Sequence, residues 1–446
     1  MRRRPMTRQE YEAMRRQRQR QNLIGIGILA VITALIVTAV VLILRPPKAQ
    51  EDKPVSAVAD TVAPVSTDEA LVGAQTPEPA VTQAPAVGGD TSGGGNTSGG
   101  TLRSVRMRVV GDIMVCDEQL DYAKQSGAYD FHDQFSLISD LLMDADYTMG
   151  NLETTIGKYN DKAYSGYPLF NSPETLLETL LDYGMDFFTL ANNHMLDRWF
   201  DGMKNTVNWV EQYGFDHVGA YRTQEERNTP VIKEIGGIKI GFVAYTHTTN
   251  TQEKVCDPAA VEYGVPYLYK ADIEGDIQRL REAGAEVVIA FPHWGKEYVR
   301  SPDSNQKKYA KRLAEAGADI IIGSHSHMVQ PMGYQTVANA DGSTRKVFTM
   351  FSMGNFISTH TLQYTDAGVI LDFTINEQPD GTFTCDNVQF IPTYCWMQDG
   401  AIRVLPSGRY LNNAPEGMNA TSYDRMVASY YEIVELLGEN FNVLNG

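Results

Sequence analysis

The chain has 446 residues, of which 43% are hydrophobic and 21% charged, so it can form one large domain or two smaller ones, each with a real core. Its formal net charge of -17 is unevenly distributed, because residues 1–22 hold eight arginines and only two glutamates. The remainder is therefore strongly acidic, which makes it a poor candidate for nucleic-acid binding and means that an anionic substrate would need local cations.

The first predicted element is a membrane-spanning helix over residues 23–44, an apolar run of 22 residues. At about 1.5 Å per residue, this helix matches the roughly 30 Å hydrocarbon core of a bilayer. A buried soluble helix is disfavoured because no charge interrupts the run. A cleaved signal peptide is the stronger alternative, but its apolar part is usually shorter and ends in small residues, whereas this run is followed by Arg45-Pro46-Pro47-Lys48.

The arginines of the basic segment 1–22 predict a cytoplasmic N-terminus and a single-pass signal anchor in the cell membrane. The main domain is then extracytoplasmic. Residues 45–103 are rich in Pro, Ala, Thr and Gly and are predicted to be a disordered linker. The main domain is expected over 104–400, followed by a C-terminal extension with a closing helix over 401–446. Four cysteines are too few for a disulfide scaffold, and no bridge is expected.

Strands and helices alternate in the first part of the main domain, and the last third contains mainly strands. The predicted strands are 105–110, 187–190, 231–234, 239–245, 287–291, 320–322, 332–337, 346–351, 369–375 and 383–392. The predicted helices are 134–143, 175–183 with Ser172 as N-cap, 203–213, 273–283, 305–316 closed by Gly317, and 423–437. This order suits a layered α/β sandwich with helices outside the sheets.

Six polar clusters follow predicted strands. They are Gly111-Asp112-Ile113-Met114, Gly150-Asn151-Leu152-Glu153, Asn192-Asn193-His194, His293-Trp294-Gly295-Lys296-Glu297, Gly323-Ser324-His325-Ser326-His327 and Ser352-Met353-Gly354-Asn355-Phe356. Each alone has a plainer interpretation, such as a turn, a helix cap or a packed core histidine. Because ligands gather at the carboxyl ends of strands in open α/β sheets, their recurrence at this position favours one shared metal or catalytic site.

The residue types in these clusters suit divalent metal. Imidazole, carboxylate and amide oxygen are ligands that Zn, Mn and Fe accept, and the sequence does not distinguish among these ions. His325 and His327, two residues apart on an extended segment, would point the same way and share or flank an ion. One ion or a pair bridged by a carboxylate would both be possible.

The order of the six motifs resembles that of the CapA-type capsule and poly-γ-glutamate synthesis family, which is similar in turn to calcineurin-type metallophosphoesterases. The resemblance runs from about Met107 to Ile357 and implies a metallophosphatase-like αββα sandwich. It implies metal ligation by Asp112, Glu153, Asn193, His293, His325 and His327, with Glu153 as the bridge. It further implies that His194 protonates a leaving group and that Asn192, Glu297 and Asn355 form the substrate pocket.

The sequence departs from true phosphoesterases at Met114, where their first motif supplies the histidine of Asp-x-His. A thioether is a poor ligand for hard ions, so an ion beside Asp112 is expected to be weakly held or missing. The second-motif carboxylate is Glu153 rather than aspartate, and Asp117 stands where many relatives carry arginine.

The leading interpretation is a membrane-anchored extracytoplasmic protein of capsule or poly-γ-glutamate biosynthesis with a metal-dependent, hydrolase-like site. The alternative is a non-catalytic subunit that binds or assembles polymer beside other membrane subunits of a polymer synthase. A third interpretation, a nucleotidase-like phosphatase, would require a separate nucleotide-binding domain for which little chain remains. The expected partners are the membrane and an anionic polymer, not nucleic acid.

Overall fold

The computed structural model describes residues 102–125, 127–157, 163–339 and 342–446. The expected basic segment, the expected anchor and nearly all of the expected linker lie outside these residues. Among the residues that are described, no helix is both long enough and apolar enough to cross a bilayer.

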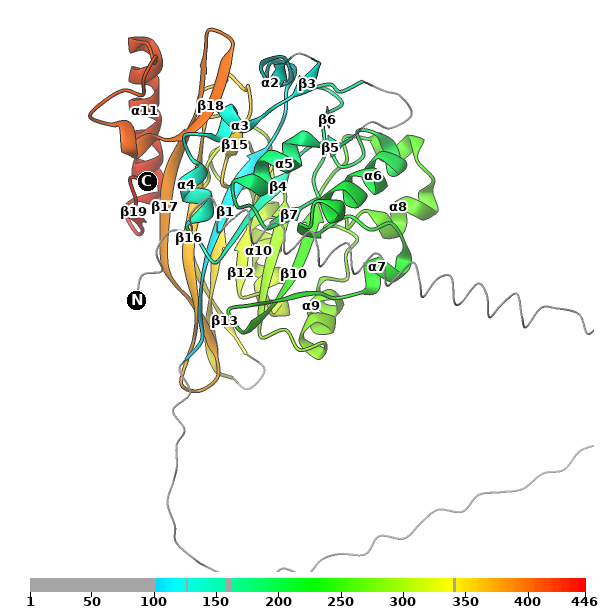
Figure 1. The fold of residues 1–446 in the computed structure, drawn as a ribbon. Coiled ribbons are helices and arrows are strands. Elements are labelled where there is room, and N and C mark those ends of the chain that lie inside the picture. The colour runs from blue at the N-terminus through cyan, green and yellow to red at the C-terminus, as the bar shows by residue number, and fades with distance from the viewer. Residues whose placement is uncertain (1–101, 126, 158–162, 340–341) are drawn as a thin grey trace, which may run out of the picture. The chain divides into compact units, whose positions relative to one another are not determined.

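Two β-sheets form the centre of the domain (Figure 1). The larger sheet has nine strands: β1 (Ser104–Ile113), β4 (Tyr147–Leu152), β7 (Phe187–Thr189), β8 (Asp216–Val218), β15 (Asn355–Ile357), β16 (Ala367–Glu377), β17 (Phe383–Gln398), β18 (Ala401–Pro406) and β19 (Asn442–Val443). Its main order is β18-β17-β16-β1-β4-β7-β8, with β15 paired to β1 and β19 paired to β17.

The smaller sheet has six strands in the order β13-β14-β12-β11-β10-β9. Their bounds are β9 (Val231–Ile235), β10 (Ile238–Thr246), β11 (Val287–His293), β12 (Ile320–Ile322), β13 (Met332–Ala338) and β14 (Thr344–Met350). Two short pairs lie apart from both sheets: β2 (Lys124–Gln125) with β3 (Ala128–Tyr129), and β5 (Thr155–Ile156) with β6 (Asn171–Ser172).

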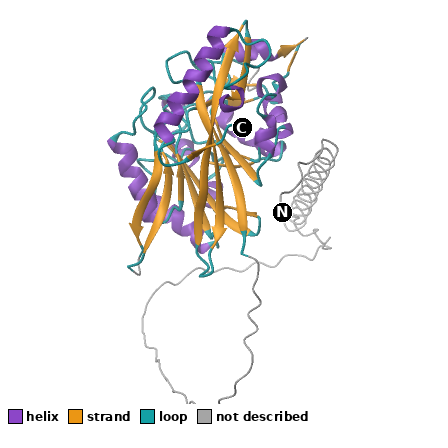
Figure 2. Ribbon diagram, turned by 90° about the vertical axis from the view of Figure 1, so that its left-hand side faces the viewer, coloured by secondary structure: helices purple, strands orange, loops and turns teal. Residues whose placement is uncertain are grey.

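The helices lie outside the strands, as Figure 2 shows. They are α2 (Asp117–Ala123), α3 (His132–Phe135), α4 (Ser139–Met143), α5 (Thr175–Asp182), α6 (Trp199–Gln212), α7 (Gln224–Asn228), α8 (Pro258–Gly264), α9 (Ile273–Glu282), α10 (Ser304–Ala316) and α11 (Ala420–Leu437). Short 3₁₀ turns occupy Gln252–Val255 and Ser407–Tyr410.

Three apolar cores separate the layers. The inner core joins alternate side chains of β1, such as Val109, to Phe242 and Ile289 of the smaller sheet. The opposite face of β1, through Val110, packs against helices including α5 and α6, and a third core joins the smaller sheet to α9 and α10. This alternation of side chains across a strand produces a helix–sheet–sheet–helix arrangement and confirms the predicted α/β class.

Each sheet contains one set of four adjacent parallel strands. In the larger sheet β1, β4, β7 and β8 run in the same direction, and in the smaller sheet β10, β11, β12 and β14 do so. Each parallel set therefore ends at one edge of its sheet, where the polar motifs follow.

Most of the predicted elements are confirmed to within a few residues. The strand over 320–322 coincides with β12, and the strands expected over 231–234 and 239–245 are β9 and β10, which pair as an antiparallel hairpin. Helix α10 ends at Gly317, whose φ of 114° is the left-handed conformation that glycine adopts easily.

Two local predictions are wrong. The helix expected over 134–143 is divided into α3 and α4, because Ile138 leaves helical geometry with φ of -126° while its side chain is fully buried. Ser172 does not cap α5; it belongs to β6, and its hydroxyl lies 2.8 Å from that of Thr154. Tertiary contacts outweigh the local signal in both cases.

The expected division at residue 400 falls in the turn between β17 and β18, which are paired in one sheet. The closing helix α11 contributes Ile433 and Leu437 to the inner core. Residues 102–446 accordingly pack as one compact unit within the described part of the chain.

Candidate metal centre

The strand ends bring the predicted ligands together. Asp112 lies near the end of β1, Glu153 follows β4, Asn193 follows β7, His293 ends β11, and both His325 and His327 follow β12. All six side chains are buried. The ends of the two parallel strand sets thus converge on a single polar cluster inside an otherwise apolar sandwich.

The first motif is part of β1 rather than a turn. Asp112 pairs with Asn355 of β15, and its backbone N–H donates to the carbonyl of Gly354 at 3.0 Å. A Cβ atom on Gly111 would lie 2.0 Å from that same carbonyl oxygen, so only glycine permits this approach. The glycine therefore has a packing role, and it allows Asp112 to face the cluster.

The first group of ligand atoms comprises Glu153, His293 and His325, whose atoms lie within 4.8 Å of one another. Nε2 of His293 is 3.0 Å from Nδ1 of His325 and 3.6 Å from Oε1 of Glu153. The amide oxygen of Asn193 is 2.9 Å from the same Nε2 atom. Two imidazoles, one carboxylate and one amide oxygen therefore face a common point.

The second group comprises Asp112, Glu153 and His327, again within 4.8 Å. Nδ1 of His327 is 3.4 Å from Oδ2 of Asp112, and its Nε2 is 3.9 Å from Oε1 of Glu153. Glu153 is common to both groups, which is the arrangement that a bridging carboxylate requires.

The environment of Glu153 shows whether these residues suit a cation. Its Oε2 accepts a hydrogen bond from Asn151 at 3.1 Å, but its Oε1 is sealed from solvent and has no hydrogen-bond partner. Burial, and next the nearby Asp112, raise the pKa of Glu153 well above its usual range. A buried carboxylate oxygen without a donor is costly unless a cation approaches it, so the donor set fits a divalent metal ion.

Two of the histidines are held neutral. Burial, followed by neighbouring imidazoles, lowers the pKa of His293 well below its usual value, and burial does the same for His325. The short contact between His293 and Glu153 is therefore not an ion pair. Neutral imidazole is the form that binds metal.

The expectation of an extended His325–Ser326–His327 segment is wrong. His325 and His327 have φ of 96° and 55°, in the left-handed region that is strained for residues other than glycine. Their ring centroids are 6.2 Å apart, and the two rings belong to different ligand groups. The tight turn directs the two imidazoles to either side of Glu153.

The predicted acid, His194, lies beside the cluster. Its ring meets Phe170 edge-on with centroids 4.6 Å apart, and its Nδ1 is 2.7 Å from Oδ2 of Asp197. Nε2 of His194 has no hydrogen-bond partner among the described residues and is not one of the sealed buried atoms. This nitrogen is therefore accessible for proton transfer.

The three predicted pocket residues do not line an opening together. Asn192 is 1% exposed and donates to the carbonyl of Leu152 at 2.8 Å, so it fastens the end of β4. Asn355 is fully buried, and its amide oxygen is 3.0 Å from Nδ1 of His327. Glu297 is exposed in the segment after β11, and its charge also contributes to the raised pKa of Glu153.

Met114 is packed rather than poised to bind. It is 1% exposed and shares a small apolar cluster with Cys116 and Phe170.

Several polar residues at the centre were not predicted. Asn151 donates to Oδ1 of Asp112 at 2.8 Å and so links the two carboxylates. His247 lies with its ring centroid 4.6 Å from that of His325, and His360 lies 4.8 Å from that of His327. Burial lowers the pKa of His360 to about 4. The role of Asp197 as the partner of His194 could have been predicted from the His-x-x-Asp spacing. His247 and His360 belong to no recognisable motif, so the sequence contains no indication of them.

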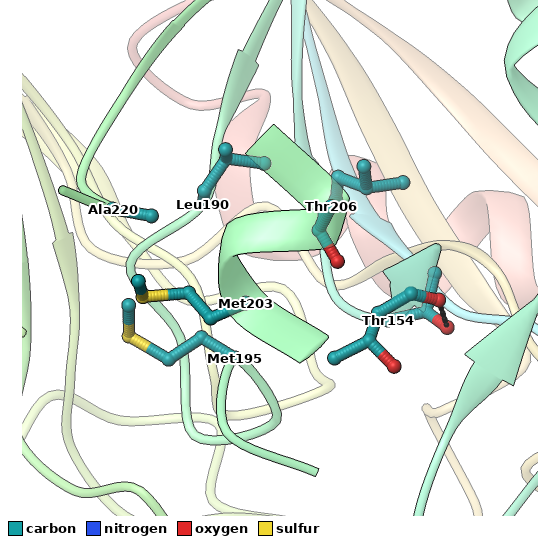
Figure 3. A pocket seen from close by; sticks show the side chains of 8 residues that line it. Thr154, Leu190, Met195, Met203, Thr206 and Ala220 are labelled. Atoms are coloured by element: carbon teal, nitrogen blue, oxygen red, sulfur yellow. Dashed lines mark hydrogen bonds between the residues drawn. The ribbon is translucent and has the colours of Figure 1, made fainter. Parts of the chain in front are cut away.

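A small cavity is lined by side chains that include Thr154, Leu190, Met195, Met203, Thr206 and Ala220 (Figure 3). Its volume of about 10 Å³ leaves room for at most a single water molecule, so it is not a substrate pocket.

The fold and the site together define an α/β two-sheet protein whose strand ends hold a buried carboxylate–histidine cluster suited to divalent metal. The chain belongs to the bacterial capsule synthesis protein family PGA_cap, whose family model matches residues 106–360. The expected family is thereby confirmed.

Two named relatives are similar over most of this region. The PGA biosynthesis protein CapA of Bacillus subtilis is 27% identical over 279 residues, covering 61% of this chain and 68% of that protein. The capsule biosynthesis protein CapA of Bacillus anthracis is 25% identical over 290 residues, covering 63% of this chain and 66% of that protein. The chain thus spans about two thirds of the length of each relative.

A solved structure, the calcineurin-like phosphoesterase YfkN of Bacillus subtilis, covers 75% of this chain and 98% of its own at 16% identity, with a TM-score of 0.40.

Proposed function

We propose that the domain is a metal-dependent, hydrolase-like protein that acts in capsule or poly-γ-glutamate biosynthesis. The observation that carries the proposal is Oε1 of Glu153, a sealed carboxylate oxygen with no hydrogen-bond donor, lying 3.6 Å from His293 and 3.9 Å from His327. If the cluster only stabilised the fold, a hydrogen-bond donor would be expected to face that oxygen.

The residues that would hold metal form two sets that share Glu153. Asn193, His293 and His325 would hold one ion, and Asp112 and His327 a second. A divalent ion there supplies a Lewis acid for the oxygen of an ester, amide or anhydride substrate. Mn, Zn and Fe all fit this mixture of ligands.

His194 would act as the proton donor to the leaving group. Asp197 accepts from Nδ1 of His194, so the imidazole is oriented, while Nε2 stays accessible. Asn151 would hold the two carboxylates in position by donating to both.

The biological role rests on the family and on the printed names of the two Bacillus relatives, a PGA biosynthesis protein and a capsule biosynthesis protein. The proposed position is outside the cell membrane, with the apolar run 23–44 as anchor and the basic segment 1–22 inside. A reporter enzyme fused after Gly99 should be active only on the outer side; activity in the cytoplasm would overturn both the anchor and the localisation.

A second function, a non-catalytic subunit that binds polymer, is favoured by Met114. The thioether is buried against Phe170, and among the His, Cys, Asp and Glu side chains of the described chain the Asp112 side offers two carboxylates and one imidazole. A centre with one firm ion and one weak one could bind polymer carboxylates without hydrolysing anything. Activity on simple phosphoesters separates the two functions.

The direct test is the metal content of the purified protein. Wild type should retain at least one divalent ion through gel filtration, and Glu153→Gln should lose most of it, because the amide keeps the shape but removes the charge. Glu297→Gln, an exposed carboxylate in the same neighbourhood, is the matched control and should retain wild-type content. Wild-type protein without metal, or equal contents in all three proteins, would refute the metal centre.

A further inference from the structure

Two loops meet beside the Asp112 side of the centre. Tyr298, in the loop after β11, has its ring centroid 5.9 Å from that of His327 and 5.8 Å from that of His360, in the loop after β15. His360 in turn lies edge-on to His327 at 4.8 Å. Tyr298 and His360 thus stand next to one predicted metal ligand without belonging to either ligand group.

The amide of Asn355 determines which nitrogen of each imidazole carries hydrogen. Nδ2 of Asn355 donates to the carbonyl of Thr365 at 2.9 Å, and since a carbonyl only accepts, the amide has one possible orientation. Its oxygen then faces Nδ1 of His327 at 3.0 Å, so that nitrogen carries the hydrogen and Nε2 keeps its lone pair. This is the tautomer that a metal ligand needs.

The same amide gives His360 the opposite tautomer. Nδ2 of Asn355 is 3.3 Å from Nδ1 of His360, so Nδ1 must accept and the hydrogen of the neutral ring lies on Nε2. Nε2 has no hydrogen-bond partner among the described residues and is not sealed within the protein. One asparagine therefore prepares His327 to bind a cation and His360 to donate a hydrogen bond.

Tyr298 offers a second donor. It is 41% exposed, and no hydrogen bond of its hydroxyl is found within the described chain. Its backbone is held in the left-handed region, with φ of 61°, by donation of its N–H to the carbonyl of Ser326 at 2.8 Å. The protein maintains this strained conformation next to the candidate site. Such strain is common at functional sites, where it positions a side chain.

The two loops are fastened to each other and to the rest of the domain. The guanidinium of Arg300 lies 4.1 Å above the ring of Tyr364 and donates to the carbonyl of Glu432 in α11 at 2.7 Å. Thr359 donates to a carboxylate oxygen of Glu118 at 3.0 Å. The two donors therefore occupy defined positions before any ligand arrives, which reduces the entropy lost on binding.

We propose that Nε2–H of His360 and the hydroxyl of Tyr298 form an oxyanion-binding subsite that holds an anionic oxygen of the substrate beside the Asp112 side of the centre. The chemistry is that of a phosphoryl or carboxylate oxygen. The proposal rests on the proposed metal centre, and it gives a strongly acidic domain two neutral hydrogen-bond donors for an anionic ligand.

The test measures binding of two probes, inorganic phosphate and glutarate, to metal-loaded protein by calorimetry, together with metal content. His360→Phe and Tyr298→Phe should each weaken binding of at least one probe by about tenfold to a hundredfold, the range for a lost hydrogen bond to a charged group. His360→Gln restores an N–H donor and should recover most of the affinity. Tyr431→Phe, an exposed tyrosine on α11, is the matched control.

Each outcome decides the proposal. Weaker binding at unchanged metal content, with recovery in His360→Gln, supports it, and the probe that is affected indicates a phosphoryl or a carboxylate substrate. Unchanged affinity for both probes in His360→Phe and Tyr298→Phe overturns it while leaving the metal centre intact. Loss of metal in His360→Gln makes His360 a support of His327 and also overturns it. Wild-type protein without metal overturns the metal centre and this subsite together.

Discussion

Asp197 and His194 form a buried pair three residues apart in the chain, with Oδ2 of Asp197 2.7 Å from Nδ1 of His194. The same carboxylate oxygen accepts from the backbone N–H of Phe170 at 2.7 Å, which fixes its position. The carboxylate thus selects the tautomer and orientation of the imidazole.

We expect His194→Gln to reduce kcat by roughly 10²–10⁴-fold, the range for loss of a general acid, at unchanged metal content. The loss should be larger on an alkyl phosphoester than on a nitrophenyl ester, because nitrophenolate leaves without protonation. Asp197→Asn should show a smaller loss of the same kind, and Asp201→Asn on α6 serves as control. Equal losses on both esters would contradict the role of His194 as acid.

Met114→His should raise the metal stoichiometry towards two, because it would add a second imidazole, besides that of His327, on the Asp112 side of the centre in place of a thioether. Met114→Leu, which preserves the apolar contact with Phe170, should leave the stoichiometry of wild type unchanged. The measurement is metal analysis after dialysis. Two tightly held ions in wild type would show that another residue completes the shell, with Asp117 and Glu118 the first to examine.

The metal-free protein should lose stability as the pH falls below about 6.5. His293 and His325 have pKa values well below that of an unfolded histidine, so the unfolded state binds more protons on acidification. The contribution of these two histidines to the free energy of unfolding is complete above pH 6.5. Below that pH it decreases by about 1.4 kcal/mol per histidine per pH unit.

Thermal unfolding with chelator at pH 7.5 and 5.5 measures this loss. The double variant His293→Gln, His325→Gln should show a smaller difference between the two pH values than wild type. Glu153 remains in both proteins; its raised pKa acts in the opposite sense, stabilising at low pH and less as pH rises, so it reduces the difference in each. If the stability difference between the two pH values were equal in both proteins, the pH dependence would not arise from His293 and His325.

Asp372→Ala should destabilise the domain by about 3–5 kcal/mol, because it leaves a buried cation without its partner. Nε of Arg108 lies 2.7 Å from Oδ2 of Asp372, and the two side chains are 2% and 4% exposed. Asp144→Ala, which removes an exposed carboxylate near the same arginine, should lower the free energy of unfolding by less than about 1 kcal/mol. Urea denaturation compares the two, and similar losses would contradict the buried pair.

The sequence was informative where the signal is local or periodic. Strand β12 is a run of three isoleucines and α10 ends in a glycine, so both could be predicted. The convergence of Asp112, Glu153 and His293 could also be predicted, because parallel strands end at the same edge of a sheet.

The parts that could not be predicted depend on distant contacts. Whether Asn355 lines a pocket or orients an imidazole is decided by the carbonyl of Thr365, and that contact exists only in the folded chain. His360 lies in a loop with no periodicity, and it reaches the centre only because β15 pairs with β1. The turn that separates His325 from His327 requires left-handed backbone that histidine seldom adopts, so their spacing suggested an extended segment instead.

Arg103, just before β1, donates to the carboxylates of Glu286, before β11, and Glu377, at the end of β16. It thereby clamps one sheet to the other at the end of β1 that lies farthest from Asp112. A mechanical load applied to the chain at Leu102 would reach this clamp first and be divided between both sheets. The ion cluster and the ladder between β1 and β16 would have to shear before the pull displaced Asp112, so tension on the preceding chain leaves the candidate metal centre undisturbed.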